Sequence, residues 1–259
     1  MKPASLTLFL LISAIFPLAA EPSVLTLNIE APPRDGFQGE AGNAITGDSD
    51  VFKSGGRYCA VAFGNDSGAG GTDVTVNGVK FHLLEPQAPQ SGPSPKWPNF
   101  ENDGIKITEI CADRSIKTSS ERAPFMNLSS SYRTILSYSS HRGDPDPAVG
   151  DMTLRYYNIS GLDSGQKYRI QIWCNDSRER QTRKGDPRTI LGGVDPEQTV
   201  VQYPGGSTDR VYVYTNRDKS GMDGELGSYF DGIGAPGPKG AFNFRTAGIV
   251  NAINVQELP

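Results

Sequence analysis

The chain has 259 residues, of which 30 are glycine and 19 are proline. Because both residue types interrupt regular helices, this composition argues against long helices, coiled coils and helical repeats. The formal net charge of -4 at pH 7 offers no basic surface for nucleic acid, and the mean hydropathy of -0.42 excludes a protein that crosses a membrane many times. The sequence therefore favours a globular protein that does not bind nucleic acid.

The first part of the chain has the pattern of a secretory signal peptide. Lys2 precedes an apolar run over residues 6–16, and the small residues Ala19 and Ala20 follow. The run is too short to span a bilayer, and the two alanines favour cleavage after Ala20. We therefore expect residues 1–20 to be removed. Residues 21–259 would form one exported domain without a membrane span, in the periplasm, at the cell surface or outside the cell.

Three cysteines, Cys59, Cys111 and Cys174, lie in or beside apolar runs. They permit one disulfide in an oxidising compartment, and the sequence does not choose among the three pairings. Three buried, reduced cysteines are an equal alternative. Their spacing matches no zinc motif.

The mature chain consists largely of short apolar or alternating runs between turn residues. Within residues 72–83, Asn77-Gly78 separates two such runs, which is typical of a hairpin with a type I′ turn. One short helix is predicted behind a candidate N-cap at Asn127, from apolar residues at helical spacing: Leu128, Tyr132, Ile135 and Leu136. The other predicted strands cover residues 24–29, 58–63, 105–111, 152–158, 167–174, 199–203, 210–215 and 248–255. Strands this short predict an all-β fold, a single β-sandwich with one short helix and long loops.

Several segments resemble a family of secreted bacterial β-sandwich domains. They are ITGDSDVFKSGG, YCAVAFGN, TVNGVKF, LRYYNISGLDSGQKYRIQIWCNDSR and VNAINVQEL, spread over residues 45–258. This family is similar to the galactose-binding jelly-roll class, which occurs in surface and polysaccharide-associated proteins. The resemblance implies a jelly-roll fold and carbohydrate binding or surface recognition, and it supplies no catalytic residues.

The runs 152–158 and 167–174 predict a second hairpin with a candidate ligand-binding face. In the second run, alternation puts Tyr168, Ile170 and Ile172 into the core. In the first run it puts Met152, Leu154 and Tyr156 inward. The side chains between these positions, in both runs, then share the outer face. A flat aromatic ring flanked by planar donors suits a sugar. The predicted ligand-binding residues are Trp173, Tyr157, Arg155, Arg169 and Gln171, with Asn175, Asp176 and Arg178 at the rim. The alternatives are that a loop or the helix covers this face and that Asn175 and Asp176 only cap a turn.

Acidic residues between positions 216 and 231 form the one candidate metal site. Asn216, Asp218 and Ser220 resemble the start of an EF-hand loop, but Gly227 stands where the loop needs a glutamate. A calcium site of another geometry would draw on Asp218, Asp223, Glu225 and Asp231. A solvated acidic loop is the alternative. The sequence predicts no cofactor other than this structural calcium ion.

The sequence predicts no catalytic residues. Gly47-Asp48-Ser49 resembles the nucleophile block of a serine esterase family, but His82 and His141 would require an unusual order of the triad. The leading hypothesis is a secreted, non-catalytic domain that binds extracellular glycan or a cell-surface polymer. The alternatives are a structural component of the cell surface or matrix, and a glycan-active hydrolase or lyase with two converging carboxylates.

Overall fold

The computed structural model describes residues 22–28, 43–64, 73–85, 98–110, 114–117, 127–141, 154–175, 188–192, 199–203, 206–207, 210–214 and 228–259. The predicted signal peptide, Cys111 and most of the candidate calcium segment lie outside these residues. In the part of the chain that is described, no helix is long and apolar enough to cross a membrane.

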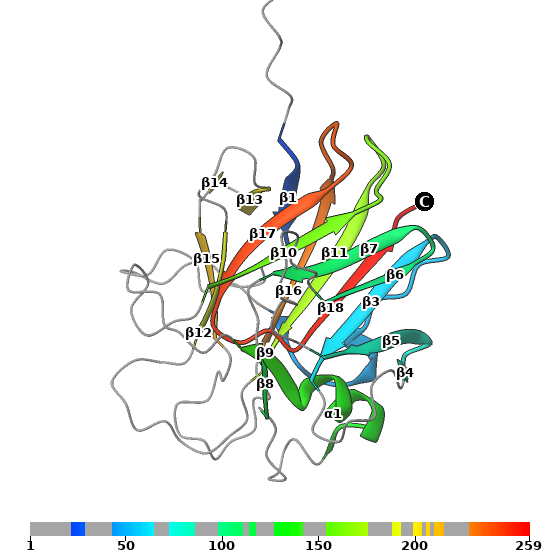
Figure 1. Ribbon diagram of the computed structural model, residues 1–259, viewed down its shortest axis with the longest axis vertical. Coiled ribbons are helices and arrows are strands. Elements are labelled where there is room, and N and C mark those ends of the chain that lie inside the picture. The colour runs from blue at the N-terminus through cyan, green and yellow to red at the C-terminus, as the bar shows by residue number, and fades with distance from the viewer. Residues whose placement is uncertain are drawn as a thin grey trace, which may run out of the picture.

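Two sheets form a sandwich (Figure 1). Sheet A has 10 strands: β1 (Val24–Leu27), β2 (Asn43–Ala44), β3 (Tyr58–Phe63), β4 (Asp73–Val76), β5 (Val79–Leu84), β11 (Tyr168–Cys174), β13 (Val200–Tyr203), β14 (Gly206–Ser207), β16 (Ser228–Ala235) and β18 (Ala252–Glu257). Sheet B has six: β6 (Asn99–Asn102), β7 (Ile105–Ile110), β10 (Leu154–Ser160), β12 (Arg188–Gly192), β15 (Arg210–Tyr214) and β17 (Phe242–Ala247). A separate pair consists of β8 (Arg114–Lys117) and β9 (Tyr138–His141).

The inner faces of the two sheets enclose the main core, which confirms the predicted all-β sandwich. Alternating residues of each strand point inward, as the period of a half-buried strand requires. Fully buried members include Leu25, Val61, Ile107, Ile159, Ile170, Phe242 and Phe244. The stacked rings of Phe242 and Phe244 lie on β17, the strand next to β10 in sheet B.

The predicted hairpin and helix are both present. β4 and β5 pair through Val76 and Val79, and positive φ angles of 47° at Asn77 and 73° at Gly78 form the turn between them. The helix is α1 (Ser130–Leu136), and its N-cap is Ser129, not Asn127, because the Ser129 hydroxyl accepts a hydrogen bond from the backbone of Tyr132.

Cys59 and Cys174 are both buried on the core face of sheet A, on strands separated by β18. Strands in a sheet lie about 4.8 Å apart, so two spacings already exceed the reach of a disulfide. This removes one of the three predicted pairings. Burial raises the pKa of the Cys59 thiol to about 12, which keeps it protonated and unreactive at neutral pH.

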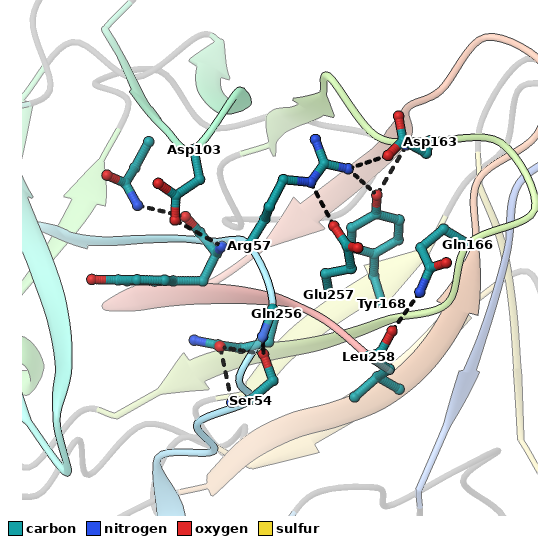
Figure 2. A network of polar contacts seen from close by, with 12 residues as sticks. Ser54, Arg57, Asp103, Asp163, Gln166, Tyr168, Gln256, Glu257 and Leu258 are labelled. Atoms are coloured by element: carbon teal, nitrogen blue, oxygen red, sulfur yellow. Dashed lines mark hydrogen bonds and ion pairs between the residues drawn. The ribbon is translucent and has the colours of Figure 1, made fainter.

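A charged network closes the end of the sandwich where β3 and β11 begin and β18 ends (Figure 2). The Arg57 guanidinium bonds Glu257 at 2.5 Å, Asp163 at 2.5 Å and the Tyr168 hydroxyl at 2.9 Å. The hydrogen bond to Glu257 raises the pKa of Arg57. One side chain therefore joins three parts of the chain that are far apart in sequence.

Candidate functional site

The prediction that residues 152–158 and 167–174 form a hairpin is wrong. β10 pairs with β7 and β17 in sheet B, whereas β11 pairs with β16 and β18 in sheet A. The connection between them crosses from one layer to the other at the closed end of the sandwich. Tyr157 and Trp173 therefore do not share a face, and the predicted ligand surface does not exist as one unit.

Trp173 faces outward from sheet A, as its alternation predicts, but it is 0% exposed. A second core covers it, formed with α1 and with residues 45–56, which run across this side of the sheet. The indole stacks on Tyr229 with ring centroids 5.5 Å apart and meets Phe81 edge-on. Its N–H donates to the Tyr132 hydroxyl at 2.9 Å. The expectation that Trp173 offers an open stacking surface is wrong, because the helix occupies that position.

Gln171 is also buried, and its amide holds the backbone of the covering segment. Its Oε1 accepts from the Phe52 N–H at 2.9 Å, and its Nε2 donates to the Asp50 carbonyl at 2.8 Å. Asn254 and Gln256 on β18 bond the same segment, at the Phe52 carbonyl and the Ser54 N–H. This amide ladder explains why polar side chains lie buried on the outer side of sheet A.

Arg169 forms a two-point ion pair with Asp231, at 2.7 and 2.6 Å, and its guanidinium lies 4.2 Å from the centre of the Phe52 ring. This pair raises the pKa of Arg169. Asp231 is 4% exposed, and its carboxylate is held in the ion pair with Arg169. Asp218, Asp223 and Glu225, the other predicted calcium ligands, lie outside the described residues.

The first residue of the predicted rim is buried. Asn175 is 0% exposed, and its N–H donates to the side chain of Asn251. Asp176 and Arg178 lie outside the described residues, and so does the side chain of Arg155, which belongs to β10.

Tyr157 points into the main core and Tyr156 points out, the reverse of the predicted phase. Tyr157 is 1% exposed, and its hydroxyl donates to the buried Glu109 carboxylate at 3.0 Å. Ile159 lies two residues further along β10 and so on the same face as Tyr157. Because isoleucine favours a buried position, Ile159 directs this face into the core. As a result Tyr156 and Asn158 lie on the outer face of sheet B.

This outer face carries a row of uncharged polar side chains that crosses four strands. We define it as the polar row: Asn99, Thr108, Asn158 and Asn243, on β6, β7, β10 and β17. Consecutive members stand opposite each other in the strand registers, so they share one face. Asn99 is exposed and the other three are half-buried. Asn158 donates its amide to Asn243 at 2.7 Å.

A second row runs beside the polar row. Tyr156 stands opposite Ile110 on β7 and opposite Arg245 on β17, and all three are half-buried. On the other side Lys106 stands between Glu101 and Ser160. The face thus presents amides and hydroxyls, one aromatic ring and a few mixed charges, a set of groups that hydrogen-bonds polyhydroxylated molecules.

Sequence reasoning missed the polar row, although a signal was present. IKITEI and FNFRTA alternate apolar and polar residues, so Thr108 and Asn243 could have been assigned to an outer face. What the sequence lacked was the order of the strands, which alone brings the four side chains into line.

No group of three or more His, Cys, Asp or Glu side chains among the described residues is arranged to hold a metal ion. Comparison of the chain with protein-family models, with curated proteins and with solved structures finds no match. The resemblance to galactose-binding jelly-roll domains stays a prediction.

Proposed function

We propose that this protein is an exported, non-catalytic recognition domain that binds extracellular glycan or a cell-surface polymer on the outer face of sheet B. The observation that carries the proposal is the polar row beside Tyr156 on a half-exposed sheet face. Amide groups both donate and accept, so they can bind adjacent hydroxyls of a sugar, while the tyrosine ring packs on its C–H face.

The expected affinity is modest. Each hydrogen bond to the ligand contributes about 1 kcal/mol, and one stacked ring adds about 1 kcal/mol. After the cost of association, these terms support dissociation constants in the micromolar to millimolar range. Several copies on one surface would raise the apparent affinity.

The test is retention on insoluble polysaccharides and on a glycan array, with the double variant Asn158→Ala/Asn243→Ala. This variant removes the hydrogen-bonded amide pair at the centre of the polar row, so binding should fall at least tenfold. The matched control is Thr26→Ala/Gln202→Ala, which removes a similar cross-strand pair (2.8 Å) from the outer face of sheet A. The control should bind like the wild type.

Three other results would overturn the proposal. Equal loss in both double variants would mean that binding lies elsewhere or reflects general destabilisation. Absence of binding to every glycan would favour a structural component of the cell surface. Release of reducing ends from the polysaccharide would favour a hydrolase or lyase.

A further inference from the structure

We infer that the ligand is a neutral, linear polysaccharide that lies across the strands of sheet B, with about one sugar ring over each strand. This inference rests on the proposed function and concerns the shape and charge of the ligand. It follows from the direction, the spacing and the charge of the polar row.

The row runs perpendicular to the strands. Its four members are related by the registers Asn99–Thr108, Thr108–Asn158 and Asn158–Asn243. Neighbouring strands lie about 4.8 Å apart, so the row extends over about 14 Å. One strand spacing approximates the length of one pyranose ring in an extended chain. A polymer lying along the row would therefore meet a polar side chain at each ring.

The row carries no charge, because its members are three asparagines and one threonine. Among the described side chains of this face, the charged ones stand in the flanking rows, where Glu101 lies opposite Lys106 on one side and Arg245 lies opposite Tyr156 on the other. These few charges of mixed sign do not supply one cation for each strand of the row. A uronate or sulfate on every ring would place a series of anions along side chains that cannot neutralise them. A neutral polymer matches the row, since each hydroxyl meets an amide or a hydroxyl.

One end of the row is exposed. Asn99 is exposed on β6, the edge strand of sheet B, so a chain can continue past the sheet at this side. A site of this form binds within a polymer and gains contacts with each added unit, up to the number of strands that contribute. A site for one terminal sugar would gain nothing from added units.

The experiment is calorimetric titration with fragments of one to six units from amylose, cellulose, xylan and mannan. For the series that binds, affinity should rise by roughly fivefold per unit up to about four units and then level off. In the double variant Asn99→Ala/Thr108→Ala, affinity should level off at a fragment length of about two units; this length is called the plateau. Glu101→Ala, on the same strand and face but outside the row, should leave the plateau unchanged. All variants should keep the melting temperature of the wild type.

The outcomes separate this inference from the proposed function. If a monosaccharide competes as well as the longest fragment, the protein binds glycan but the linear arrangement is wrong. Preference for acidic polysaccharide over all four neutral series would overturn the neutral assignment. If neither polysaccharide nor fragment binds, the proposed function fails and this inference fails with it.

Discussion

The indole nitrogen of Trp173 donates a hydrogen bond to the hydroxyl of Tyr132 at 2.9 Å, which joins the centre of sheet A to helix α1. The same hydroxyl contacts the Asp50 carboxylate at 2.9 Å. Burial, and next the charge of Asp50, raise the pKa of Tyr132 well above its usual value, so the hydroxyl stays protonated and donates to Asp50. Three segments distant in sequence are thus connected through one buried side chain.

Trp173→Ala should therefore destabilise the fold and not act as a binding variant. Loss of a fully buried indole costs about 3–5 kcal/mol in the free energy of unfolding. Tyr132→Phe, which removes only the bridging hydroxyl, should cost about 1–3 kcal/mol. Urea unfolding monitored by fluorescence and circular dichroism measures both. A Trp173→Ala protein as stable as the wild type would contradict the second core.

Tyr156 and Tyr157 should respond in opposite ways to the same substitution. Tyr157→Ala leaves a cavity in the main core and removes the hydrogen bond to the buried Glu109 carboxylate, so it should cost about 3–5 kcal/mol in the free energy of unfolding. Tyr156→Ala should cost less than about 1 kcal/mol, since its ring is half-buried, while it weakens glycan binding. Thermal unfolding and polysaccharide retention distinguish the two. If Tyr156→Ala proved the more destabilising of the two, Tyr156 would be the core residue, as alternation from Met152 predicted, and the orientation in the structure would be contradicted.

Arg57→Ala should loosen the closed end of the sandwich. The variant loses two carboxylate contacts and the bond to the Tyr168 hydroxyl, for about 1–2 kcal/mol in total. Arg57→Lys keeps the charge but cannot reach three partners at once, so it should recover only part of that loss. The Arg57 side chain is one-third exposed, so salt can screen its ion pairs. In 1 M salt, where the Debye length is about 3 Å, the difference in unfolding free energy between Arg57→Ala and wild type should therefore shrink. An undiminished difference would point to packing as the cause.

Acid stability should depend on Asp73. Its hydrogen bonds with Lys80 and then with His82 lower the pKa of this carboxyl below the ordinary value. A lowered pKa in the folded state contributes stability above the unfolded pKa of about 3.9, and this contribution is lost as the pH falls through the folded pKa. Asp73→Asn should therefore be less stable than wild type at neutral pH, and this difference in stability should become smaller below about pH 4. Melting temperatures measured from pH 7 to pH 2 test this, and parallel curves would contradict it.

Local patterns in the sequence predicted strands at the positions of β3, β4, β5, β7 and β11, but none at the positions of β6, β12, β16 and β17. Asn-Gly at 77–78 determined the turn between β4 and β5, because few residues adopt the positive φ angles that it needs. The apolar spacing from Leu128 to Leu136 determined the buried face of α1. Alternation along β11 correctly separated Ile170 and Ile172 from Gln171 and Trp173.

Tertiary structure decided what those faces meet. Alternation assigns Trp173 to the outer side of sheet A, but only the placement of α1 and of residues 45–56 determines that this side is buried. In β10 the sequence pattern allows either Tyr156 or Tyr157 to point inward. Tyr157 is the buried one because it lies on the same side of the strand as Ile159, which packs in the main core. The polar row exists only because β6, β7, β10 and β17 lie next to one another in sheet B. Strand order depends on contacts between residues far apart in the chain, and a local pattern carries no information about it.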